Sequence, residues 1–211
     1  MADTFKELLE GNEIWVKDIQ QKAPDLFDDM AEGQHPQFLW IGCADSRVPA
    51  EEITNSLPGS IFVQRNVANL VIHTDYNLLS VVNYAVKNLK VKHIIICGHY
   101  GCGGIKAAMG NTSYGLLDNW LSHIKDIYKI NKQELDEIAD QEARERRFVE
   151  LNVQEQVGNV AKLAFIQEEW KQENEFPYVH GWVFNIEDGC IKNLGLTVNR
   201  ADHLDKVYQY D

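Results

Sequence analysis

The sequence predicts an α/β domain with a mainly parallel sheet, an antiparallel edge strand, flanking helices and an N-terminal helical arm. Two observations support this fold class. Short apolar runs alternate with longer amphipathic segments, the order that gives parallel strands joined by right-handed helical crossovers. The last two apolar runs are instead joined by the short turn at 187–189, so we expect them to pair as an antiparallel hairpin.

Residues 1–30 are expected to form the helical arm. Pro24 divides it into two segments, and apolar residues recur in it at helical spacing. Its aromatic side chains would pack either on the chain's own core or across a neighbouring subunit, and the second option places the arm at an oligomer interface. The apolar positions are Phe5, Leu8, Leu9, Trp15 and Ile19.

The remaining elements follow from apolar periodicity and from glycine-containing turns. Strands are expected at 37–42, 60–65, 92–97, 178–185 and 191–196. Helices are expected at 75–89, 103–109, 116–128 and 133–172, the first capped by Thr74. Within the last helix one apolar face is marked by Val153, Val157, Val160 and Ala164. No linker or repeat divides the chain, so we expect one domain over residues 1–211.

The composition of the chain argues against several classes of function. The 211 residues carry a formal net charge of −12 and 45% hydrophobic residues, which suits one folded domain and disfavours a nucleic-acid or anionic-membrane surface. No run approaches the length of a membrane-spanning helix, and the acidic start does not resemble a signal peptide. The four cysteines lack the spacing of a disulfide scaffold. We therefore expect a cytoplasmic protein with a small substrate, and neither a nucleic-acid nor a membrane partner.

Three residues of metal-ligand type follow two of the predicted strands. Cys43 ends the run FLWIGC, while His99 and Cys102 lie in the turn after HIIICG. The carboxyl ends of parallel strands meet at one edge of a sheet, so these side chains are expected to converge there. Two thiolates and one imidazole suit zinc and leave its fourth position open, as a catalytic zinc requires.

The two other cysteines, Cys97 and Cys190, are not expected to bind the metal. Cys97 ends a strand and is expected to face the core; if it bound the ion, the site would have four protein ligands and would be only structural. Cys190 lies beside a hairpin turn and is expected to be structural or incidental.

Asp45 and Arg47 follow Cys43 in the same loop. They are either an ordinary surface ion pair or a unit in which Asp45 accepts the proton of the reacting water while Arg47 keeps the carboxylate ionised and oriented.

Four motifs together resemble the β-class carbonic anhydrases, in particular the bacterial type with a Trp before the ligand loop, and the likeness extends over nearly the whole chain. The motifs are CADSR at 43–47, RNVAN at 65–69, HYGCGG at 99–104 and HGW at 180–182.

The resemblance implies a function. Cys43, His99 and Cys102 would bind one zinc ion per subunit, and Asp45 with Arg47 would be the catalytic dyad. The reaction would be the reversible hydration of carbon dioxide to bicarbonate and a proton by a zinc-hydroxide mechanism. The family also implies a sheet of four strands plus an edge strand, arms that embrace a second subunit, and dimers that pair into tetramers.

Two further groups of residues follow from the resemblance. Val48, Phe62, Tyr84 and Gly103 are candidates for the carbon dioxide pocket, in part from a partner subunit, although Val48, Phe62 and Tyr84 suit core positions equally well. Trp40 and Arg65 match two of three residues of a non-catalytic bicarbonate pocket, whose third residue, a Tyr, is replaced by Phe184. The missing hydroxyl puts that regulatory pocket in doubt.

Two other functions are compatible with the sequence. In one, Cys43 is a free nucleophile activated by Arg47. In the other, the protein binds zinc and bicarbonate without turnover. The proton carrier is also open among His73, His93, His123, His180 and His203.

Overall fold

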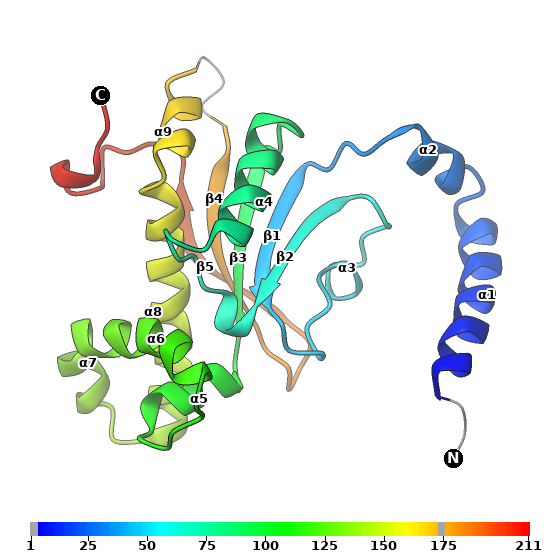
Figure 1. Cartoon of the computed structure of the whole chain (residues 1–211). Coiled ribbons are helices and arrows are strands. Elements are labelled where there is room, and N and C mark those ends of the chain that lie inside the picture. Colours follow the sequence, from blue (N-terminus) through cyan, green and yellow to red (C-terminus); the bar gives the residue numbers. More distant parts are fainter. Residues whose placement is uncertain (1–3, 173–175) are drawn as a thin grey trace. The chain divides into compact units, whose positions relative to one another are not determined.

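The computed structural model describes residues 4–172 and 176–211. The contacts between residues divide the chain into two compact units. The first unit ends at His35, and the larger second unit begins at Pro36. The first unit is the arm, which consists of α1 (Thr4–Lys22) and α2 (Leu26–Glu32) (Figure 1). The predicted break at Pro24 is confirmed. Within this unit the ring of Trp15 packs edge-on against Phe27, with 5.7 Å between ring centroids.

The larger unit is built on a five-stranded sheet in the order β2-β1-β3-β4-β5 (Figure 1). Neighbouring strands are parallel from β2 to β4, and β5 is antiparallel to β4. The predicted fold class, including the antiparallel edge strand, is confirmed. The strands are β1 (Phe38–Cys43), β2 (Ile61–Asn66), β3 (His93–His99), β4 (Tyr178–Phe184) and β5 (Ile191–Val198).

Helices and short turns connect these strands. They are α3 (Ala50–Ile53), η1 (Val67–Asn69), α4 (Tyr76–Lys87), α5 (Gly103–Met109), α6 (Leu117–Ile130), α7 (Lys132–Glu137), α8 (Gln141–Ala161), α9 (Ala164–Trp170) and η2 (Lys206–Tyr208).

The single helix expected at 133–172 was wrong, because the segment forms α7, α8 and α9. The Asp140 side chain accepts a hydrogen bond of 2.7 Å from the Ala143 amide and so starts α8. Ala164 is exposed at the start of α9 and does not share the buried face of Val153, Val157 and Val160.

The predicted cap of α4 was also wrong. Asp75, and not Thr74, caps the helix, since its carboxylate accepts from the amides of Asn77 and Leu78 at 3.0 and 3.3 Å. A carboxylate at this position satisfies two amides that have no partner within the helix.

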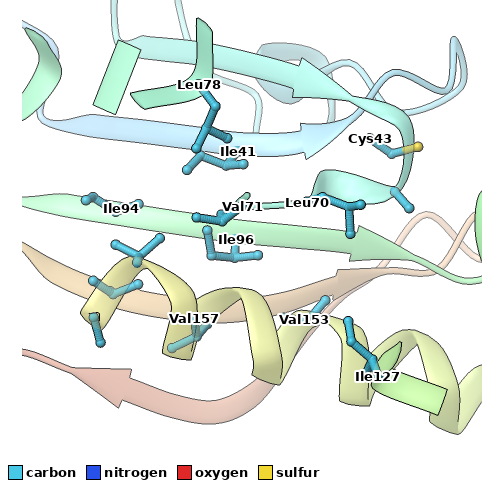
Figure 2. Close-up of a cluster of buried hydrophobic side chains, with 14 of the residues drawn as sticks. Ile41, Cys43, Leu70, Val71, Leu78, Ile94, Ile96, Ile127, Val153 and Val157 are labelled. Atoms are coloured by element: carbon cyan, nitrogen blue, oxygen red, sulfur yellow. The ribbon is translucent and has the colours of Figure 1, made fainter. Parts of the chain in front are cut away.

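The sheet separates two apolar clusters. The larger one lies on the face covered by α4, α8 and α9, where Ile41, Ile96 and Val157 are fully or almost fully buried (Figure 2). The smaller one lies on the opposite face. Within the described part of the larger unit, α3 is the helix that adds residues to it. Its buried members are Trp40, Val48, Ala50, Ile95, Cys97 and Phe184.

None of the described helices combines the length and the apolar character that crossing a bilayer would demand.

Candidate metal centre

Three buried side chains converge at the carboxyl end of the parallel strands. Cys43 ends β1, His99 ends β3, and Cys102 directly precedes α5. One ligand atom from each lies within 4.8 Å of the other two, which makes these residues a metal-binding group. The sheet edge therefore brings together the three ligands that the sequence predicted.

The spacing of the two sulfurs fits zinc. Sγ of Cys43 lies 3.9 Å from Sγ of Cys102. Tetrahedral ligands at a Zn–S distance of about 2.3 Å are separated by about 3.8 Å. Nearby backbone amides act to lower the pKa of both thiols, those of Ala68 and Asp45 at Cys43 and those of Gly104 and Ile105 at Cys102.

A hydrogen bond links the two thiols. The hydrogen bond from Cys102 lowers the pKa of Cys43, and that bond, together with burial, raises the pKa of Cys102. Binding of a cation would favour the thiolate form of both sulfurs.

The Nε2 atom of His99 is available as a metal ligand. Its Nδ1 atom lies 3.1 Å from the carbonyl oxygen of Tyr100, so Nδ1 donates and Nε2 keeps its lone pair. Nε2 is buried and has no hydrogen-bond partner. A buried nitrogen without a partner is costly, and an ion held between it and the two sulfurs would satisfy it.

Asp45 and Arg47 form a close pair at this site. Nε of Arg47 donates to Oδ1 of Asp45 at 2.9 Å, and a terminal guanidinium nitrogen donates to Oδ2 at 2.8 Å. These bonds hold the pKa of Asp45 well below its usual range. Oδ2 also lies 3.7 Å from Nε2 of His99, which places the carboxylate beside the metal-binding group.

The side chain of Arg65 fixes the backbone at the end of β1, around Cys43. Its Nε donates to the Cys43 carbonyl at 2.8 Å, and another guanidinium nitrogen donates to the Asp45 carbonyl. The backbone on both sides of Ala44 is thus fixed from β2.

Trp40, Arg65 and Phe184 come from strand positions that face the side of the smaller cluster. Nε1 of Trp40 is buried without an acceptor, and a Cβ built on Gly42 would lie 2.4 Å from it. Glycine at position 42 therefore leaves the space that this indole occupies. Nε1 of the neighbouring Trp182 is likewise buried without an acceptor.

The remaining cysteines lie outside the metal-binding group. Cys97 is fully buried in the smaller cluster, where burial raises the pKa of its thiol. This confirms that it faces the core. Cys190 is exposed near the turn between β4 and β5.

The candidates for the substrate pocket are scattered. Gly103 adjoins Cys102 and is exposed, and Val48 is buried in the smaller cluster. Phe62 pairs with Leu39, four positions before Cys43, and its ring lies 5.9 Å from that of Tyr84. At about 3.3 Å per residue this is about 13 Å along the strand from the metal-binding group, so one chain does not bring Phe62 and Tyr84 to the site.

Comparisons with known proteins agree with this geometry. Residues 38–191 match the family model for carbonic anhydrase. The chain belongs to the β-class carbonic anhydrase family. Its reaction is therefore the zinc-dependent, reversible hydration of carbon dioxide to bicarbonate and a proton. This reaction argues against the alternative function in which Cys43 is a free nucleophile.

Individual relatives are similar over most of their length. A carbonic anhydrase of Emericella nidulans is 47% identical over 196 residues, which cover 93% of this chain and 86% of that protein. A structure from Sordaria macrospora, one of two tetrameric β-carbonic anhydrases, has a TM-score of 0.88 and 39% identity, with 93% of this chain and 99% of that chain covered. The Coccomyxa β-carbonic anhydrase in complex with acetazolamide has a TM-score of 0.89 and 36% identity, with 96% and 90% covered. The bacterial subtype remains a prediction.

The sequence did not lead us to one set of buried polar residues that hold the segment after β2. Asn152 of α8 bonds to the backbone of Ala68 in η1, and Gln156 and Asn159 of α8 bond to the backbone of Val71, in the segment that follows β2. A sequence pattern could have revealed these three residues. Each of them directly precedes one of the apolar positions Val153, Val157 and Val160, so polar residues recur at helical spacing beside a buried face.

Proposed function

We propose that Cys43, His99 and Cys102 hold the zinc ion, and that Asp45 and Arg47 are the catalytic dyad. Two observations support this most directly: one ligand atom each of Cys43, His99 and Cys102 lie within 4.8 Å of one another, and the buried Nε2 of His99 has no hydrogen-bond partner and lies 3.7 Å from Oδ2 of Asp45.

A bound zinc ion supplies a Lewis acid that lowers the pKa of a water molecule to about 7. The carboxylate of Asp45 accepts the hydrogen of the reacting oxygen and so directs a lone pair of that oxygen toward the carbon of carbon dioxide. Arg47 keeps Asp45 ionised and donates to both of its oxygens, so that Asp45 would be held back from the metal and a position there would stay open to solvent. Stopped-flow hydration of carbon dioxide, with zinc analysis of the same sample, tests the proposal. A zinc-loaded protein without turnover would instead be the binding protein considered from sequence.

Gly103 and Val48 are proposed to line the substrate pocket from within the chain. Phe62 and Tyr84 would reach a pocket only in a neighbouring subunit, since they lie away from the metal-binding group of their own chain.

The arm supports a proposal about assembly. Phe5, Leu8, Leu9 and Ile14 are each more than half exposed, and contiguous apolar surface of this kind marks a contact surface. We infer that it packs on a second copy of the chain and that the protein forms dimers that pair into tetramers. The tetrameric relative from Sordaria macrospora supports this. Four free thiols and the acidic charge favour the cytoplasm as the location.

Deleting residues 1–30 is expected to abolish the assembly or cause aggregation, because apolar surface on the partner loses its cover. Size-exclusion chromatography with light scattering measures this. Leu8→Asp should reproduce the effect, and Glu10→Lys on the same helix serves as the control that should not. A well-behaved, fully active monomer after truncation would refute the embracing arm.

The second bicarbonate pocket is proposed to be weak. Nε1 of Trp40 offers a buried donor, but Phe184 brings no hydroxyl. One lost hydrogen bond to a charged group corresponds to about 1.5–3 kcal/mol, or about ten- to a hundredfold in affinity.

Phe184→Tyr is therefore expected to increase inhibition by bicarbonate, measured as activity against bicarbonate concentration at fixed pH, and to favour an inactive form with Asp45 on the metal at low pH. A crystal soak would locate the ion. The proposal fails if the natural protein already binds bicarbonate between Trp40 and Arg65 as tightly as the variant, for example through a water or the free indole N–H of Trp182.

A further inference from the structure

Two of the proposed ligands are joined by a two-residue turn. Tyr100 and Gly101 lie between His99 and Cys102, and Gly101 has a φ of 71°, a conformation that glycine adopts without strain. The carbonyl oxygen of Tyr100 accepts the hydrogen bond from Nδ1 of His99 at 3.1 Å. The position of Tyr100 therefore bears directly on how the His99 imidazole is oriented.

The backbone of Tyr100 is fixed from β4. Its amide donates to the carbonyl of Phe184 at 3.0 Å. His99 pairs with Phe184 at the end of the two parallel strands, so this bond continues their ladder one residue beyond the ligand. The amide nitrogen of Tyr100 is thus held by the sheet.

The side chain of Tyr100 is fixed from α8. Its hydroxyl donates to Oε1 of Glu150 at 2.7 Å, and the guanidinium carbon of Arg146 lies 3.9 Å from the centre of its ring. Tyr100 is 7% exposed. A hydrogen bond to a carboxylate and a cation over an aromatic ring are both strengthened where water is largely excluded.

Glu150 is itself held in place. Nζ of Lys192 in β5 donates to Oε1 at 2.7 Å, and a guanidinium nitrogen of Arg147 donates to Oε2 at 3.1 Å. Both carboxylate oxygens are therefore bonded, and Glu150 presents a fixed acceptor to the hydroxyl of Tyr100.

These contacts restrict the carbonyl of Tyr100. With the amide nitrogen and the side chain held, the tetrahedral Cα leaves one direction for the carbonyl carbon. The rotation that remains, about the Cα–C bond, points the oxygen at Nδ1 of His99.

Giving a buried hydroxyl a partner is the simplest role of the bond to Glu150. The location of Tyr100 indicates a second role, because a metal-bound histidine is oriented by the acceptor of its other ring nitrogen. That acceptor is here the backbone of Tyr100 itself.

We propose that Tyr100 is a positioning residue of the metal centre: its hydroxyl bond to Glu150 holds the turn between His99 and Cys102 so that its carbonyl orients the His99 imidazole. The inference rests on the proposed zinc ligands. It gives α8, which supplies none of those ligands, a part in the site.

Tyr100→Phe removes the hydroxyl and keeps the ring. The variant is expected to release zinc to a chelator about tenfold faster and to lose about tenfold in kcat/KM, the lower end of the effect of weakening support for a metal ligand. The Nδ1 proton of His99 should also exchange faster with solvent, which its shifted proton NMR signal in the cobalt-substituted protein measures. Tyr128→Phe is the control. The Tyr128 hydroxyl also donates to a carboxylate at 2.7 Å, that of Asp136, so its loss should leave all three readouts unchanged.

Variants of Glu150 test the same bond from its other end. Glu150→Leu removes the acceptor and should reproduce the faster release of zinc, whereas Glu150→Gln keeps an acceptor oxygen and should stay close to the wild type. Adding Tyr100→Phe to Glu150→Leu should have little further effect on zinc release, since both changes break one bond.

Zinc release and proton exchange at wild-type rates in Tyr100→Phe would overturn the inference. A Glu150→Gln protein that releases zinc as fast as Glu150→Leu would overturn it too, because the charge of Glu150 would then matter and not its bond to Tyr100. His99→Ala separates the inference from the ligand assignment. This variant should hold no zinc, and release at the wild-type rate would refute His99 as a ligand and the inference with it.

Discussion

Replacing Cys43, His99 or Cys102 by alanine is expected to remove zinc and carbon dioxide hydration together. The three ligand atoms lie within 4.8 Å of one another, and an ion that loses one of three protein ligands is no longer held in catalytic geometry. Zinc content by mass spectrometry and stopped-flow hydration of the same samples measure both effects. Activity should fall to the uncatalysed rate.

Cys97→Ala is the matched control for the ligand variants. Cys97 is as buried as the ligands but packs in the smaller apolar cluster, so its loss should cost about 1 kcal/mol of stability and leave zinc occupancy intact. Near-normal zinc content with normal turnover in any ligand variant would show that the replaced residue is not a zinc ligand.

Asp45→Asn should keep the zinc but lose most hydration, by about 100-fold or more, since a positioned proton acceptor contributes about 10²–10⁴-fold. The amide presents N–H groups where the mechanism needs an acceptor, and it leaves Arg47 without its counter-charge. Hydration rates and zinc content measured from pH 6 to 9 check this.

The pH dependence sharpens the prediction for Asp45. The bonds from Arg47 lower the pKa of Asp45 below its ordinary value near 4, so the carboxylate is ionised throughout this range. The loss in Asp45→Asn should therefore be the same at every pH. Asp202→Asn, in the exposed pair of Asp202 with Arg200, is the control, and an Asp45 variant as active as this control would make the dyad an ordinary surface ion pair.

The sheet and the metal-binding group could be predicted because both depend on local patterns. The apolar runs FLWIGC and HIIICG form buried strands, and parallel strands carry the residues that follow them to one edge. That is why Cys43 and His99 meet although 56 positions separate them (99 − 43).

The left-handed turn of η1, at Ala68 and Asn69, could not be predicted in the same way. Asparagine tolerates the left-handed conformation that Asn69 adopts, but alanine does not favour it, and at Ala68 it is accompanied by a hydrogen bond from Asn152 of α8, over 80 positions away. The division of the segment at 133–172 was missed because helical periodicity continues across the breaks, and only the cap at Asp140 marks the start of α8.

Zinc K-edge X-ray absorption of the purified protein tests the central claim most directly, because it reports the atoms bound to the metal. The account predicts one zinc per chain with two sulfurs at about 2.3 Å and two lighter atoms, one of them an imidazole nitrogen, at about 2.0–2.1 Å. A third sulfur detected at this distance would mean that Cys97 or Cys190 also binds the metal. Either that result or a protein purified without zinc would contradict a site made of Cys43, His99 and Cys102 with one open position.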